Sequence, residues 1–342
     1  MTPHLSALMF LPLGTLPVLC FLALLLFLDS FKLVRLSFVL SAIGIGMLLA
    51  VPAFLANRIV LTAWHLDFMD YAHFGSPFIE EFLKAGAVYL LIRSNRMGFL
   101  IDAAIVSFSI GAGFALAENI FYLYTIGHSS LAVWIVRGFG TAVMHGGATA
   151  IFAILSLAIT EQVGSTAFRY YLPGYLAGVL IHGTFNQLAF SPYLATLITV
   201  IALPLLMYFV FDRSTAALKN WLELDFEADA DLLRQIASSE FEATAVGAYL
   251  TELQQRFDPL IIVDMLCYVR NYTELSMRAK GVMLMREQNL EMPPDPAVED
   301  KFSEMKYLEK SIGRTGMLAL DPLLHMDAKD LWHLNVLEAS TR

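Results

Sequence analysis

The sequence predicts an all-α protein, a polytopic membrane helix bundle of about seven spans followed by a soluble helical cytoplasmic domain. Hydrophobic residues make up 57% of the 342-residue chain, and the mean hydropathy is +0.63, which is too apolar for a soluble protein of this size. Residues 1–211 hold eight basic and eight acidic side chains, whereas 212–342 hold 14 and 23. The net charge of −9 therefore lies in 212–342, and we place the domain boundary there.

Seven apolar runs are long enough to be considered as membrane spans, which need about 20 residues. The first carries no charge and has no basic residue before it, so we interpret it as a retained span and not as a signal peptide. The third is short and opens with charges. The mixed, aromatic segment 57–76 before it is typical of the membrane interface. The seven runs are 5–28, 36–56, 77–92, 98–126, 131–160, 171–190 and 192–211.

The loop charges predict the orientation in the cell membrane. With seven spans, most Lys and Arg residues fall in loops on one side, and basic loops mark the cytoplasmic side. The N-terminus is then outside, and the acidic domain 212–342 is in the cytoplasm. Its net negative charge argues against nucleic acid as a partner. The lipid bilayer is an expected partner of the apolar spans.

Several polar residues lie inside the predicted spans, where ionisable groups are costly and mark functional sites by default. At a rise of 1.5 Å per residue, they lie about 10 to 20 Å from the outer membrane boundary. They share the region between that boundary and the mid-membrane, so we expect them to converge on one site. They are Glu80, Glu81 and Lys84 in the third span, Glu118 and Asn119 in the fourth, His145 in the fifth, and His182 and Asn186 in the sixth.

Each of these residues also has a purely structural interpretation. Glu80 and Glu81 follow Ser76, a good N-cap, and Pro77, a good first helical residue, so both acids could simply favour the helix dipole. The long side chain of Lys84 could extend along its helix and place its charged end at the membrane interface.

The remaining polar groups have structural alternatives of the same kind. His145 could be a packed histidine, and the pairs Glu118–Asn119 and His182–Asn186 could join helices by hydrogen bonds. We interpret Arg137 and Asp102 as anchors near the membrane interface.

Two carboxylates and two histidines permit two hydrolytic routes. In the first, His145, His182 and Glu81 bind Zn²⁺, which lowers the pKa of a bound water. In the second, no metal takes part and a desolvated glutamate activates water. We favour the second route, because the paired glutamates supply a base and the H-x-x-x-N helix offers hydrogen-bond donors and not a tight ligand set. Glu81 is the expected base, because the i, i+4 spacing pairs Lys84 with Glu80. The soluble zinc-protease signature H-E-x-x-H and the hydrolase signature G-x-S-x-G are absent.

Four motifs resemble those of the PrsW family of intramembrane proteases, which is related to the CAAX prenyl proteases and the bacterial CPBP proteins. They are EEFLK (80–84), FALAEN (114–119), the glycine-flanked His145 and HGTFN (182–186). The resemblance implies proteolysis of a membrane-anchored protein, often in regulated signalling. It also implies that Glu80, Glu81, Glu118, His145 and His182 are catalytic, with Asn186 in the H-x-x-x-N pattern, while Lys84 and Asn119 support the site.

Two other classes of function remain open on this reading. Intramembrane glutamates and histidines also relay protons in transporters, and a catalytically inactive scaffold would need none of this chemistry. The acidic region 212–342 has helical periodicity and a helix-start signal at Asp258-Pro259. We expect it to regulate the enzyme or to bind a cytoplasmic partner, with a stabilising appendage as the alternative. We expect His325 and His333 to be lone and exposed to solvent.

Overall fold

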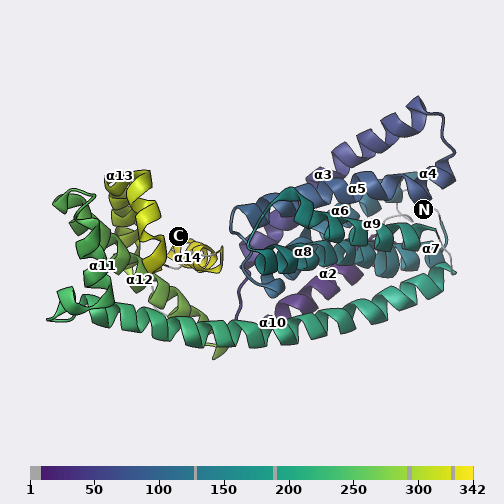
Figure 1. Cartoon of the computed structure of the whole chain (residues 1–342). Helices are drawn as coiled ribbons and strands as arrows, with labels where there is room; N and C mark the ends of the chain where they lie inside the picture. Colours follow the sequence, from purple (N-terminus) through teal and green to yellow (C-terminus); the bar gives the residue numbers. More distant parts are fainter. Residues whose placement is uncertain (1–8, 127–128, 188–190, 291–294, 325–327, 342) are drawn as a thin grey trace. The chain divides into compact units, whose positions relative to one another are not determined.

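The structure is a computed structural model of the whole chain, and it describes all residues except 1–8, 127–128, 188–190, 291–294, 325–327 and 342. The described residues form helices and connecting loops, with no strand among them (Figure 1). The all-α prediction is confirmed to that extent. By their contacts, the residues divide into two compact units, one comprising 1–29 and 33–214 and the other 30–32 and 215–342.

Unit 1 contains the helices that carry the predicted site. They are α2 (Leu11–Leu28), α3 (Leu36–Ala63), α4 (Phe68–Phe74), α5 (Ser76–Arg93), α6 (Leu100–Ile126), α7 (Leu131–Ile135), the π-helix η1 (Val136–Ala142), α8 (Val143–Val163), the 3₁₀-helix η2 (Phe168–Tyr171), α9 (Leu172–Asn186) and the first part of α10 (Pro192–Ile236).

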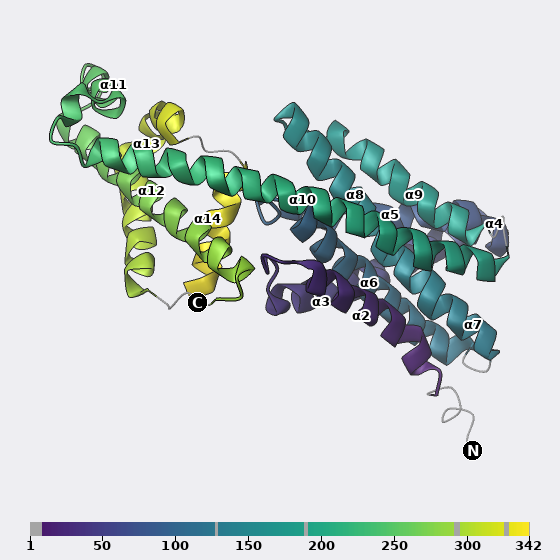
Figure 2. The ribbon, with the colours of Figure 1, turned by 90° about the horizontal axis from the view of Figure 1, so that it is seen from below.

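Helix α6 is the central helix of unit 1. Its residues 101–115 are all buried, and it packs between α3 and α8 (Figures 1 and 2). Gly46 of α3 allows the approach on one side, since a Cβ there would lie 1.9 Å from the carbonyl oxygen of Ile110. Helix α9 packs against α8 and α5. These contacts bring α5, α6, α8 and α9 together.

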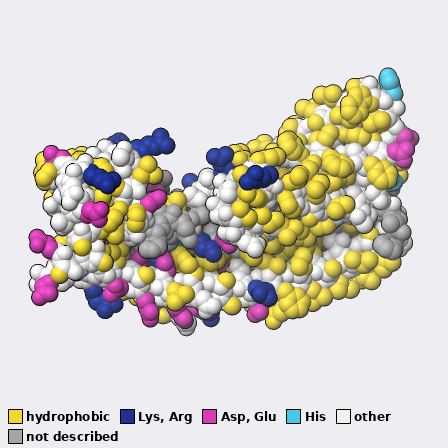
Figure 3. Space-filling view, in the orientation of Figure 1, with side chains coloured by type: hydrophobic (Ala, Val, Ile, Leu, Met, Phe, Trp, Pro, Cys, Tyr) yellow, Lys and Arg dark blue, Asp and Glu magenta, His cyan; other side chains and the backbone are white. Residues whose placement is uncertain are grey.

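Five helices are long and apolar enough to cross a membrane by length and composition. They are Leu11–Leu28, Leu36–Ala63, Leu100–Thr125, Leu131–Val163 and Pro192–Ile236. Three of them, α2, α3 and α10, are only 22% buried over their apolar windows, and the visible face of unit 1 is largely hydrophobic (Figure 3). Lipid is the solvent that suits such a surface, so the chain is a multi-pass membrane protein.

The other two predicted spans exist as helices but do not meet these criteria. Helix α5 carries four charged residues, and the described part of the sixth predicted span, α9, has only 15 residues. The last three residues of that span, 188–190, lie outside the described residues, as do the first four of the span predicted at 5–28. The count of seven therefore stays a prediction, as does the orientation.

Unit 2 is built from the remaining helices: the end of α10, η3 (Phe241–Ala243), α11 (Ala245–Leu253), α12 (Pro259–Glu287), α13 (Pro296–Leu324) and α14 (Ala328–Thr341). Its core is shared among α11, α12, α13 and α14. The helix start predicted at Asp258-Pro259 is confirmed, because the Asp258 carboxylate caps the helix by accepting from the backbone N–H of Leu260. Gly313 has non-helical backbone angles (φ 70°, ψ 169°), so α13 consists of two helical segments joined at a kink.

One prediction for this unit is wrong. His333 is fully buried, with its Nε2 3.1 Å from Ser276 Oγ, because α14 packs against α12. The other histidine, His325, lies outside the described residues.

Candidate active site

Helix α5 buries three charged side chains within two turns. Glu80, Glu81 and Lys84 are 9%, 3% and 0% exposed. Lys84 Nζ donates to Glu81 Oε1 at 2.6 Å and lies 3.0 Å from His145 Nδ1. The predicted pairing of Lys84 with Glu80 is therefore wrong. An i, i+3 pair shares a helix face as well as an i, i+4 pair does, and the contact with His145 draws the lysine toward Glu81.

The interpretation of the two glutamates as simple helix caps does not fit this geometry. The residue before the helix is Gly75, and Ser76 does not cap, since its hydroxyl donates back to the carbonyl oxygen of Ala72. Glu80 and Glu81 lie beyond the first turn. Their carboxylates therefore face other helices, where the helix N-terminus does not account for the cost of burying them.

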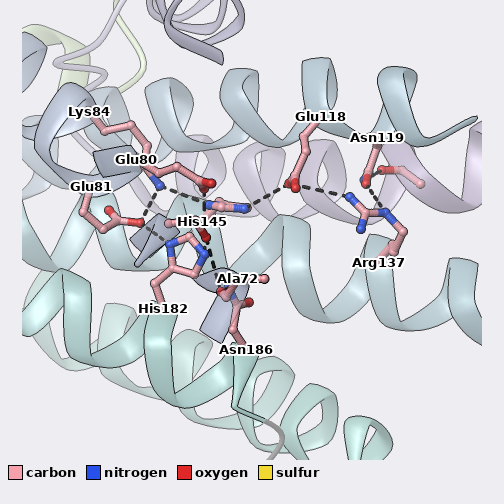
Figure 4. A network of polar contacts seen from close by, with 12 residues as sticks. Ala72, Glu80, Glu81, Lys84, Glu118, Asn119, Arg137, His145, His182 and Asn186 are labelled. Atoms are coloured by element: carbon pink, nitrogen blue, oxygen red, sulfur yellow. Dashed lines mark hydrogen bonds and ion pairs between the residues drawn. The ribbon is translucent and has the colours of Figure 1, made fainter. Parts of the chain in front are cut away.

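His182 of α9 lies between the two glutamates. Its Nδ1 contacts Glu81 Oε1 at 2.7 Å, and its Nε2 lies 3.9 Å from Glu80 Oε2. The rings of His182 and His145 are 4.6 Å apart and nearly perpendicular. Figure 4 shows side chains of α5, α8 and α9 turned toward one another, namely Glu80, Glu81, Lys84, His145 and His182. These predicted site residues therefore converge.

Glu118 of α6 extends the cluster through His145. Its Oε2 lies 3.1 Å from His145 Nε2 and 3.6 Å from Arg137 Nη2. Arg137 is also held by Asn119, whose Oδ1 accepts from Arg137 Nε at 2.9 Å, and it stacks over Tyr122 with its guanidinium carbon 3.8 Å from the ring centroid. The interpretation of Arg137 as an interface anchor therefore missed its place in the network (Figure 4).

Asn119 and Asn186 lie at the edge of this network and bind backbone. Asn119 Nδ2 donates to the carbonyl oxygen of Gly14 on α2, and Asn186 Nδ2 donates to that of Ala72 on α4. Both amides join helices, as their structural interpretation anticipated. Asp102 is buried at the start of α6, where its carboxylate accepts from the backbone N–H groups of Gly98 and Phe99.

Two residues that the sequence reasoning did not single out connect to the Glu80 carboxylate, one directly and the other through the first. Asn57 Nδ2 donates to Glu80 Oε1 at 3.0 Å, and Tyr71 donates its hydroxyl hydrogen to Asn57 Oδ1 at 2.8 Å. Helix α3 continues to Ala63, past the predicted end of its span at 56. The polar Asn57 in this continuation of the helix was the feature of the sequence that could have indicated its contact with the site.

Local backbone geometry sets the position of His145. The π-helix η1 lies directly before α8, and π-helical turns occur frequently at functional sites. Opposite His145, Gly111 of α6 is required for packing, because a Cβ there would lie 2.3 Å from the His145 carbonyl oxygen and 2.7 Å from Thr149 Oγ1.

Comparison with known proteins bears on what this cluster does. The family model described as "PrsW family intramembrane metalloprotease" matches residues 35–211, which is more than half of the chain and includes every residue of the cluster. The chain belongs to the PrsW family. No curated protein and no solved structure matches it. As a member of this family, the chain is an intramembrane peptidase.

The family description raises the question whether these residues fit a metal ion. Glu80, His145 and His182 each offer a ligand atom, and the three atoms lie within 4.8 Å of one another. Two imidazole nitrogens and a carboxylate oxygen are a donor set that suits Zn²⁺. The contact of Glu81 with His182 Nδ1 is the outer partner that metal-binding histidines usually have. The residues therefore fit a zinc ion.

Two details of the predicted ligand set change. The carboxylate grouped with the histidines is that of Glu80. Glu81, the predicted ligand, instead contacts Nδ1 of His182. His145 has contacts at both ring nitrogens, with Lys84 at Nδ1 and with Glu118 at Nε2. A ligand role for His145 would require it to give up one of these two contacts.

Proposed function

We propose that this PrsW protein hydrolyses peptide bonds of membrane-anchored protein substrates, in the outer half of the bilayer, with Glu80 as the reactive carboxylate. The observation that supports this role is that the two adjacent glutamates have different partners. Glu81 is ion-paired with Lys84, whereas Glu80 receives an amide N–H from Asn57 and faces His182 Nε2. A carboxylate that is desolvated but not neutralised by a lysine is suited to accept a proton.

The side chains suggest a sequence of proton movements. A water between Glu80 Oε2 and His182 Nε2 would touch two proton acceptors if His182 carries its proton on Nδ1, toward Glu81. Glu80 takes a proton from this water as the oxygen attacks the scissile carbonyl carbon, and the proton then passes to the leaving amine nitrogen. Lys84, held between Glu81 and His145, supplies fixed positive charge beside the developing oxyanion.

Zinc offers a second route, favoured by the grouping of Glu80, His145 and His182. A zinc ion held by these three residues would supply a Lewis acid that acidifies water and polarises the carbonyl. We expect the metal-free route, in which purified active protein carries less than stoichiometric zinc and keeps its activity after chelation. Stoichiometric zinc, with activity lost on chelation and restored by Zn²⁺, would make Glu80 a ligand and overturn its role as base.

The direct test of proteolysis combines substrate discovery with a purified assay. Membrane proteomes of cells that express the wild-type chain or His182→Asn are compared, and single-span proteins that accumulate only with the variant become tagged reporters. The purified wild-type chain in lipid nanodiscs should cleave at least one of these reporters, and His182→Asn should not. Proton flux through the protein without cleavage of any reporter would instead support the transporter interpretation.

The expected orientation has its own test. We propose that the N-terminus is outside and that residues 212–342 are in the cytoplasm, where they regulate the enzyme or bind a partner. The proposed orientation follows from the loop charges. A cysteine introduced at position 220 of a cysteine-free chain should react with maleimide only after the membrane is permeabilised. Labelling in intact cells would reverse the orientation and move the site to the cytoplasmic half.

A further inference from the structure

The two oxygens of the Glu80 carboxylate face different neighbours. Oε1 accepts a hydrogen bond from Asn57 Nδ2 at 3.0 Å, while Oε2 points toward His182 Nε2 at 3.9 Å. The carboxylate can rotate about its last torsion, which is broad and two-fold. The bond to Asn57 therefore selects the rotation that presents Oε2 to the histidine.

The orientation of the Asn57 amide is itself determined. An asparagine side chain has one acceptor end and one donor end. Tyr71 gives its hydroxyl hydrogen to Asn57 Oδ1 at 2.8 Å, which turns the amide nitrogen toward Glu80. A flipped amide would place its oxygen against the carboxylate, so Tyr71 and Glu80 favour the same orientation.

Tyr71 is in turn held by its surroundings. Its side chain is 7% exposed on α4, and the Asp67 carboxylate caps that helix by accepting from the backbone N–H groups of Met69 and Asp70. Asn186 of α9 binds the carbonyl oxygen of Ala72, the residue after Tyr71. The three side chains Tyr71, Asn57 and Glu80 thus form a hydrogen-bonded chain across α4, α3 and α5.

We propose that Asn57 and Tyr71 are positioning residues for Glu80, with Tyr71 acting only through Asn57. This inference rests on the proposed role of Glu80. It assigns a catalytic purpose to α4, because the segment that connects α3 to α5 then orients the reactive carboxylate. It also predicts a dependence that ordinary interhelical hydrogen bonds would not show, because removing Tyr71 should matter only while Asn57 is present.

A cleavage assay on the full chain in nanodiscs tests this dependence with a tagged single-span reporter that the wild type cleaves. Asn57→Leu should lower kcat on the order of 10²-fold, since small misplacements of a catalytic group have effects of that size. Tyr71→Phe should lower kcat by about three- to tenfold, equivalent to one ordinary hydrogen bond. The double variant should be no worse than Asn57→Leu, and KM should stay near the wild-type value in all three.

Tyr171→Phe is the matched control. It removes another buried tyrosine hydroxyl of unit 1, one without a hydrogen-bond partner in the part of the chain that the structure describes, and it should leave kcat unchanged. Additive losses in the double variant, or losses confined to KM, would overturn the positioning role and leave Asn57 and Tyr71 as interhelical contacts.

An infrared measurement separates this inference from the proposed function because it needs no substrate. The difference spectrum between the wild type and Glu80→Gln isolates the bands of the Glu80 side chain. These bands should shift in Asn57→Leu and, less, in Tyr71→Phe, but not in Tyr171→Phe. Unshifted bands would overturn the chain of contacts, whereas shifted bands with no cleavage of any reporter would overturn only the proposed function.

Discussion

Each unit of the chain contains one fully buried lysine held by carboxylates, and the two sites differ in an instructive way. In unit 1, Lys84 pairs with Glu81 and contacts His145. In unit 2, Lys280 of α12 pairs with both Asp225 and Asp229 of α10. Lys, acid and His occur together in both places, so residue type alone does not mark a catalytic site.

The difference lies in how the acids are used. In unit 2, both aspartates bind the lysine, and Asp229 also accepts from Ser276 at 2.6 Å, which in turn contacts His333. In unit 1, only one of two adjacent glutamates binds the lysine, and the other faces a histidine. In unit 2 each aspartate is a direct partner of the lysine, whereas in unit 1 Glu80 binds Asn57 and faces His182, where its carboxylate can react.

The largest expected effect comes from removing each lysine. Lys84→Met should destabilise the protein by about 3–5 kcal/mol, because a buried pair loses one partner and leaves the other charged. Lys280→Met should destabilise it by less, because its partners Asp225 and Asp229 are partly exposed and stay hydrated. Thermal unfolding in detergent measures this loss. Cleavage per folded molecule should collapse only in Lys84→Met. An equal loss of cleavage per folded molecule in Lys280→Met would remove the distinction between the two sites.

A smaller effect tests how closely the helices must approach at the unit 1 site. Gly111→Ala places a methyl group against the His145 carbonyl, and overpacking of this kind costs about 1–3 kcal/mol. Gly86→Ala of α5 is the control, since nothing lies within 4 Å of its added Cβ, and it should be neutral or stabilising by about 0.5–1 kcal/mol. If the two substitutions changed the thermal stability in the same direction, that result would contradict the tight α6–α8 contact.

The smallest effect concerns pH and unit 2. Burial tends to raise the pKa of Glu274, but hydrogen bonds from Lys301 and Arg270 outweigh it and hold the pKa below its ordinary value of 4.5. A lowered pKa adds stability that is present above about pH 4.5 and is lost as the pH falls below that value. The protection factors of the α12 and α13 amides, which correct for the intrinsic pH dependence of hydrogen exchange, should therefore fall below pH 4.5 in the wild type and depend less on pH in Glu274→Gln. An identical pH dependence in the two proteins would contradict this contribution.

The sequence was sufficient to predict four helices of the site and most of the charged residues that converge there. Apolar runs and intramembrane polar groups are local signals, so α5, α6, α8 and α9 and their charged residues could be read from them. The choice between Glu80 and Glu81 could not. Both lie within one turn of Lys84, and the outcome depends on where His145 of α8 lies, which no local pattern encodes.

The contribution of Asn57, Tyr71 and Arg137 was missed for a related reason. Asn57 and Tyr71 are 14 residues apart, in a segment whose mixed composition is typical of the interface. Their importance appears only when α3, α4 and α5 are placed side by side. Arg137 lies near the start of its predicted span, where an arginine is ordinarily an anchor, and only the position of Glu118 shows otherwise.

Glu80→Gln and Glu81→Gln, compared side by side, test the central claim most directly. Cleavage of a tagged single-span reporter and thermal stability are both measured on the purified full chain at equal amounts of folded protein. Glu80→Gln should lose on the order of 10²-fold in cleavage rate at wild-type stability. Glu81→Gln should lose about 3–5 kcal/mol of stability, because it leaves Lys84 buried without its counter-charge. Wild-type cleavage by Glu80→Gln, or a loss of stability in Glu80→Gln as large as that in Glu81→Gln, would contradict the account.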